Sequence, residues 1–105
     1  MATVSQVFIF KPRPGHLEAF IKDLGKLNTV VKRAGGKMRA WNENSGGNPG
    51  SIAVVVQHAD WKAFGEYRSK FDSDPDFQKL RAEVLGRKDP LADLISSAMS
   101  EEVPS

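Results

Sequence analysis

The side chains best suited to proton transfer in this chain are its two histidines, His16 and His58. His16 follows a Pro-Gly pair at the start of an expected helix, where an imidazole is usually solvated. His58 ends an apolar run, Ile52–Val56, and alternation places it on the face of the even-numbered residues of that run. If that face borders a cavity, His58 could serve as an acid, a base or a haem ligand. We take His58 as the candidate catalytic residue; the alternative is a structural histidine bonded to a neighbouring loop.

Two further side chains could hold a ligand. Trp41 and Arg39 alternate onto one face of an expected strand. A large ring beside a guanidinium can stack on a planar anionic molecule, so both are candidate ligand-binding residues. The same pair would also suit a seam between two copies of the chain. Trp61 and Tyr67 fall on one stripe of an expected helix, and we expect them in the core.

The sequence does not indicate a metal-binding site. The chain has no cysteine, which excludes disulfides, thiolate catalysis and cysteine-ligated metals. The spacings His16-x-Glu18 and His58-x-Asp60 are too loose to specify coordination, and no two histidines stand four residues apart on a helix. We therefore predict no metal site and no resident cofactor, with haem as the one cofactor left open.

Other classes of function are excluded by motif or charge. The chain has no GxSxG, P-loop or GxGxxG pattern, so triad chemistry and phosphate cradling are not expected. The net charge is +2, and the 15 basic side chains are scattered among 13 acidic ones, which makes nucleic-acid binding unlikely. No apolar run approaches the ~20 residues of a membrane span, and no signal peptide is evident. Without cysteine, the composition fits a reducing cytoplasm.

The hydrophobic pattern predicts alternating strands and helices. The expected strands are Thr3–Lys11, Lys37–Asn44, Ser51–His58 and Ala92–Val103, and the expected helices are His16–Arg33, Trp61–Phe71 and Asp76–Leu85. Asp60 is placed to cap the second helix, and Asp74-Pro75 to stop it and start the third, whose inward residues would be Phe77, Leu80, Val84 and Leu85. Gly35-Gly36 would end the first helix, and Ser45–Gly50 would be a turn. The segment 92–103 could also form a helical stripe, but the topology needs a final strand.

The resulting β-α-β-β-α-β order, in one domain spanning residues 1–105, is the ferredoxin-like split βαβ motif. This fold is an α+β arrangement in which helices cover one face of a four-stranded antiparallel sheet. The first and third expected strands carry apolar residues in both registers, so the second sheet face must also be covered. We expect an isologous homodimer in which two sheets pair face to face into a barrel.

Two segments carry a resemblance. KPRPGHLEAFIKDL, followed by DWKAFGEYRSKFDSDPDFQKL, resembles the dimeric α/β-barrel superfamily, and within it small NIPSNAP-like and antibiotic-biosynthesis-monooxygenase-like proteins. The similarity extends from Val4 to Val103 and implies a dimeric barrel. Members of the superfamily range from haem-degrading and quinone-forming oxygenases to proteins with no known activity. The haem-degrading members use an asparagine, tryptophan and histidine set; Asn42, Trp41, Trp61 and His58 supply these residue types without matching the pattern position by position.

Two functions therefore remain open. The first is a homodimeric ligand-binding or interaction module without catalysis, with a small apolar or aromatic molecule as its ligand. The second is a small monooxygenase, cofactor-free or haem-dependent, that acts on a planar apolar substrate between the sheet and the helices. The monooxygenase requires an open pocket lined by His58 or Trp41, whereas the barrel of the module would be filled by its own side chains, so an open or a packed pocket distinguishes the two functions.

Overall fold

The computed structural model of this chain describes residues 3–42 and 50–103. The strands are β1 (Val4–Pro12), β2 (Lys37–Asn42), β3 (Ile52–His58) and β4 (Ala92–Glu101), and the helices are α1 (Leu17–Ala34), α2 (Trp61–Ser73) and α3 (Pro75–Leu85). The strands form one antiparallel sheet in the order β2-β3-β1-β4. This is the predicted α+β ferredoxin-like fold, with the second helical connection divided into α2 and α3.

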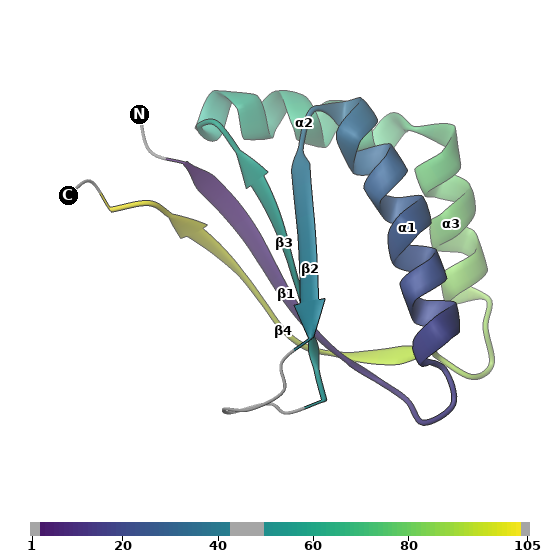
Figure 1. Cartoon of the computed structure of the whole chain (residues 1–105). Helices are drawn as coiled ribbons and strands as arrows, with labels where there is room; N and C mark the ends of the chain where they lie inside the picture. The colour runs from purple at the N-terminus through teal and green to yellow at the C-terminus, as the bar shows by residue number, and fades with distance from the viewer. Residues whose placement is uncertain (1–2, 43–49, 104–105) are drawn as a thin grey trace.

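All three helices lie on one side of the sheet (Figure 1). Helices α1 and α3 run side by side, and α2 crosses the end of the sheet where β3 stops. Strand β4 is an edge strand that begins below the ends of α1 and α3 and then runs away from these two helices. The layer of helices therefore covers the sheet unevenly, with β2 and β3 beneath it and most of β4 beyond it.

The pairing register assigns each strand residue to a sheet face. Val4 pairs with His58, Phe8 with Val54, and both pairs belong to the face that contacts the helices. The core lies there, built on the buried residues Phe20, Leu24, Val31, Ala34, Ile52, Val54, Val56 and Tyr67. The opposite face, which we call the open face, carries Val7, Ile9, Arg39, Trp41, Ala53 and Val55. The prediction that both sheet faces carry apolar residues is confirmed.

Capping residues fix where the helices begin and end. The Asp60 carboxylate accepts a hydrogen bond from the Ala63 backbone N–H at 2.8 Å, which starts α2. The Asp74 carboxylate accepts from the Asp76 N–H at 2.8 Å, and Pro75 occupies the first position of α3, where no donor is needed. Gly35 has φ +101°, the left-handed conformation that closes α1. These three predictions from sequence are confirmed.

The segment after α3 is a strand, as predicted: β4 pairs with β1 along Ala92–Glu101, with a shift in register beside Phe10. Its side chains are mostly exposed. The helices meet it near its two ends, where Ala92 packs against the core cluster of Phe20 and Leu24 and Glu101 accepts a hydrogen bond from α2. The residues 43–49, which include most of the expected turn and the end of the second expected strand, lie outside the described residues. None of the described helices is long and apolar enough to cross a membrane.

Two expectations about the core are wrong. Val84 and Leu85 were expected to face inward, but in the last turn of α3 they are 47% and 73% exposed. Trp61 was expected in the core, yet it is 52% exposed at the first position of α2. Its indole N–H donates to Glu101 of β4 at 3.1 Å, which ties the start of α2 to the edge strand.

Candidate functional site

The structure contains an open cavity between the helix-facing side of the sheet and the helices. It has a volume of about 220 Å³, and we call it the inner cavity. Its floor is formed by β1 and β3, and its walls by α1, α2 and the start of α3. The lining residues are mostly aromatic or aliphatic: Gln6, Phe8, Phe10, Leu27, Val31, Val54, Val56, Tyr67, Arg68, Phe71 and Phe77. An apolar lining with a few polar groups is typical of sites for small molecules.

A second cavity, of about 300 Å³, adjoins the first, since both are lined by Phe10, Leu27 and Phe77. We call it the outer cavity, and the two together the sheet–helix cavity. Its wall includes the exposed Val84 and Leu85 of α3. Asp23 and Arg87 also line it, and the Arg87 Nη1–H donates to the Asp23 carboxylate at 2.6 Å. This ion pair and Arg81 place charge at a cavity whose other lining residues are apolar.

Two buried polar side chains, Gln6 and His58, are hydrogen-bonded to each other beside the inner cavity. Gln6 lines the cavity and is 8% exposed; the Nε2–H of His58 donates to its Oε1 at 3.2 Å. That bond places the proton of a neutral imidazole on Nε2 and leaves Nδ1 as an acceptor. Nδ1 is buried and has no hydrogen-bond partner among residues 3–42 and 50–103. Burial also lowers the pKa of His58 below its ordinary value of 6.5, so the ring is neutral at pH 7.

Tyr67 forms part of both the cavity wall and the packing around the histidine. Its ring centroid lies 4.4 Å from that of His58 and 5.2 Å from that of Phe71. Burial raises the pKa of the Tyr67 phenol to about 12, which keeps it a neutral hydrogen-bond donor. Gly36 allows this packing, because a Cβ at that position would lie 3.0 Å from Cε2 of Tyr67 and 3.1 Å from Cγ1 of Val56.

The three residues singled out from the sequence do not lie together. His58 lies on the same face as Val54 and Val56, as alternation predicted, but it is 4% exposed and does not line the inner cavity. Arg39 and Trp41 pair with Val55 and Ala53 on the open face of the sheet. A site that combines the imidazole with this tryptophan and arginine is therefore not formed within one chain. The role assigned to each residue stays a prediction.

The same geometry shows whether these residues could bind a metal ion or haem. Within the described part of the chain, no group of three or more histidine and acidic side chains could hold a metal ion. An axial histidine for haem would have to face open space beside the cavity. His58 instead packs between Phe64 and Tyr67, at centroid distances of 5.0 and 4.4 Å, and its Nε2 contacts Gln6. The residues present do not fit a haem ligated by His58.

Sequence reasoning missed Gln6, Arg68 and most of the cavity lining. Gln6 alternates with Val4 and Phe8 on the helix-facing side of β1, and a polar residue on a buried face is a signal that the sequence did contain. Arg68 follows the buried Tyr67 on α2 and looks like an ordinary helix-surface residue. The cavity itself depends on how far α2 and α3 stand from β1, which no local pattern encodes.

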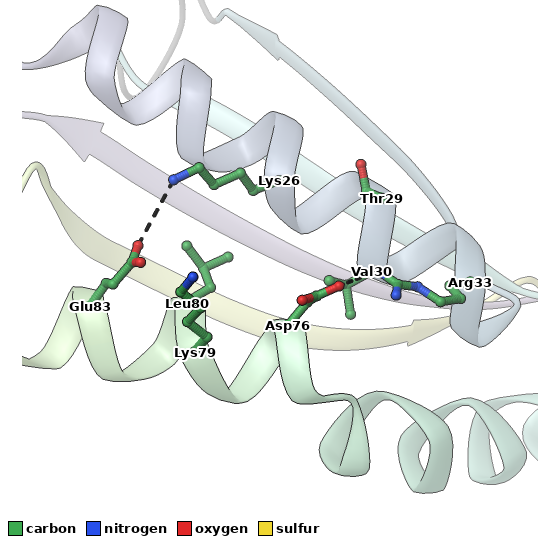
Figure 2. Close-up of a pocket in the computed structure, with 8 residues that line it drawn as sticks. All are labelled: Lys26, Thr29, Val30, Arg33, Asp76, Lys79, Leu80 and Glu83. Atoms are coloured by element: carbon green, nitrogen blue, oxygen red, sulfur yellow. Dashed lines mark hydrogen bonds and ion pairs between the residues drawn. The ribbon is translucent and has the colours of Figure 1, made fainter.

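A different kind of groove, of about 280 Å³, lies between α1 and α3 on the outer surface (Figure 2). Lys26 and Glu83 reach toward one another across it, with Nζ 3.9 Å from Oε2, and Arg33 pairs with Asp76 at 3.0 Å. Exposed ion pairs of this kind contribute about 0–1 kcal/mol each, and here they help align the two helices. Because most of its charged groups are already paired, this groove is a weaker candidate for a ligand than the sheet–helix cavity.

Comparisons with known proteins agree with the geometry. No protein-family model matches the sequence, and no curated protein matches it significantly. Among solved structures, the chain is similar to an uncharacterised NIPSNAP domain protein from Burkholderia xenovorans, with a TM-score of 0.71 and 15% identity over 97% of this chain and 94% of that one. It is also similar to a NIPSNAP family protein from Agrobacterium tumefaciens, with a TM-score of 0.68 and 14% identity over 98% and 93%.

A third similar structure is a candidate antibiotic biosynthesis monooxygenase from Chloroflexus aurantiacus, with a TM-score of 0.65 and 17% identity over 98% of this chain and 95% of that one. At these identities the likeness concerns the fold, since one fold can carry many activities. The expected resemblance to NIPSNAP-like and monooxygenase-like proteins is thus confirmed at the level of the fold.

Proposed function

We propose that this protein is a cytoplasmic homodimer that binds a small, planar, apolar molecule in the sheet–helix cavity. The observation that carries the proposal is the open, mostly apolar lining of that cavity beneath α2 and α3. Its two parts measure about 220 and 300 Å³, which is room for a ligand of one or two fused rings. The cytoplasmic location is supported by the absence of cysteine.

The polar groups of the inner cavity support a ligand with one polar end. Gln6 can offer its amide to the cavity, and Arg68 lines it with a guanidinium that lies 3.5 Å from Asp72. Phe8, Phe71 and Phe77 offer ring surfaces to a flat molecule. A fused-ring phenol, such as naphthol, matches both features.

The dimer is supported by the open face of the sheet. Val7, Ile9 and Val55 form an apolar centre there, and Trp41 stands beside it, 50% exposed. A second copy of the chain, related by a twofold axis, would cover this centre with the same residues. Twofold symmetry is the commonest symmetry of small oligomers. We propose that Arg39 and Trp41 belong to this seam.

Isothermal titration calorimetry with naphthol tests the proposed site. We expect Val54→Phe to weaken binding, since Val54 lies in the cavity floor and the added ring atoms would occupy the cavity. The matched control is Val55→Phe, one residue along the same strand but on the open face. Binding that is equally weakened by both variants, or by neither, would count against the cavity as the site; thermal melts of each variant establish that it is folded.

The second candidate is a monooxygenase, favoured by the neutral imidazole of His58 directly behind Gln6. His58 does not line the cavity itself; through its hydrogen bond to Gln6 it would position the cavity amide that contacts a phenolic substrate. Oxygen uptake with naphthol above the rate of buffer alone, lost in His58→Gln while naphthol binding persists, would support it. Binding without oxygen uptake would leave the non-catalytic module as the function.

A further inference from the structure

A separate groove lies between α1 and β2, the edge strand on the side of the sheet opposite β4. It has a volume of about 350 Å³. Ile21, Gly25 and Asn28 of α1 form one side, and Met38 and Trp41 of β2 form part of the other. We call it the edge groove. Of the residues that line it, only Leu24 also lines the outer cavity, so the two spaces lie on different sides of that side chain.

One residue that lines the edge groove, Asn28, carries an unpaired polar atom. The amide oxygen of Asn28 is buried and accepts no hydrogen bond from the described residues. A buried acceptor without a donor costs about 1–3 kcal/mol, so such atoms are normally paired. An N–H or O–H group of a molecule seated in the groove could supply the missing donor.

The edge groove also contains a glycine that the helix does not need. Gly25 stands in the middle of α1, where glycine is unfavourable relative to alanine. A Cβ at this position would have no neighbour within 4 Å among the atoms that the structure describes. Packing against the rest of the chain therefore does not require a glycine here, whereas a ligand lying against the helix backbone would.

We infer that the edge groove is a second binding site, for a compact aromatic molecule that carries an N–H donor. The missing side chain at Gly25 leaves room for a flat ring against α1, and Asn28 supplies the acceptor. Half-exposed Ile21 provides apolar surface at the rim. A cavity of about 150 Å³ suffices for benzene, so a bicyclic ring fits the edge groove in size. Indole is the simplest probe of this class, and indene is its carbon isostere without the N–H.

Titration of the ¹⁵N-labelled full chain with each probe tests the inference. With indole we expect amide shifts centred on Gly25, Asn28 and Ala40, and about tenfold tighter binding than with indene, the ratio that one neutral hydrogen bond supplies. Asn28→Leu should abolish that preference and remain folded, because it removes an unpaired polar atom. Indole shifts centred on Val54 and Val56 would instead report the sheet–helix cavity and would overturn this inference without affecting the proposed function.

Two glycine variants distinguish the filling of the edge groove from a general effect of replacing a glycine within a helix. Gly25→Leu should weaken indole binding at least tenfold because its side chain would occupy the groove. Gly65→Leu is the matched control: Gly65 lies within α2, and a Cβ there also meets nothing within 4 Å in the described chain. Both variants should melt at a higher temperature than the parent chain. Unchanged indole binding in Gly25→Leu, or equal affinities of the parent chain for indole and indene, would overturn the inference.

Discussion

The rings of His58 and Tyr67 lie with their centroids 4.4 Å apart, at an angle of 52°. This contact joins the end of β3 to the middle of α2, beside the wall of the inner cavity. Both groups are buried, and burial moves the pKa of each away from neutrality: that of His58 is lowered and that of Tyr67 is raised. Both side chains are therefore neutral at pH 7, and their titrations report on how well α2 is docked.

The tyrosine can be observed alone, because Tyr67 is the only one in the chain. We expect its phenol to ionise with a midpoint near 12, against an ordinary pKa of 10.0, because burial disfavours the phenolate. An ultraviolet absorbance titration, with circular dichroism recorded on the same samples, measures this midpoint. A midpoint near 10 in protein that is still folded would show that α2 does not bury the ring.

The histidine should make the fold sensitive to mild acid. The unfolded chain takes up a proton at an ordinary histidine pKa of 6.5, whereas the folded chain does so only at lower pH, so the free energy of unfolding falls as pH drops below 6.5. His58→Gln removes this contribution and should flatten the dependence of melting temperature on pH between about 7 and 5. The slope is compared rather than the absolute stability, since the substitution also changes packing. Identical slopes in both proteins would contradict the buried, neutral histidine.

Local signals explain why most of the fold could be predicted. The caps at Asp60, Gly35 and Asp74 depend on contacts between residues that are close in the sequence, so the local sequence is enough to predict them. Strand alternation likewise placed His58 on the helix-facing side and Arg39 with Trp41 on one face. The exposure of Trp61 and Leu85 depends instead on where a helix ends relative to the sheet, which is a tertiary property.

The candidate site was harder to predict for the same reason. Alternation located His58 on the correct face but could not show that Gln6, from a strand 52 residues earlier, would be its partner. The separation of Trp41 from His58 follows from the register of β2 against β3, which places them on opposite faces. The sheet–helix cavity arises from the spacing between α2, α3 and β1, which a single sequence does not encode.

The Asp74 cap offers a test of helix α3. Asp74→Ala should cost about 1 kcal/mol, a typical loss for a capping side chain. Its carboxylate also lies 3.4 Å from Nε of Arg33. Asp74→Asn keeps a capping oxygen but removes the charge, and Asp76→Ala removes only an exposed partner of Arg33, so both should cost less. Chemical denaturation measures all three; equal losses in Asp74→Ala and Asp74→Asn would mean that the ion pair, not the cap, stabilises the helix.

The proposed dimer is tested by a charge on the open face. The monomer has a mass of 11.5 kDa, and we expect light scattering at micromolar concentration to give twice that value. A face-to-face pair should bury at least the ~1,200 Å² of a specific interface. Val55→Lys would place a charge at the centre of that interface and should shift the chain to a folded monomer. A parent chain that is monomeric at these concentrations would contradict the dimer.

The most direct measurement locates a bound ligand by its contacts with methyl groups. In ¹³C-methyl-labelled protein saturated with naphthol, we predict intermolecular nuclear Overhauser effects to Leu27, Val31, Val54 and Val56, which line the inner cavity. Val7, Ile9 and Val55 lie on the open face and provide internal controls in the same spectrum. Effects confined to those three residues, or none at all under saturating naphthol, would contradict a ligand site between the sheet and the helices.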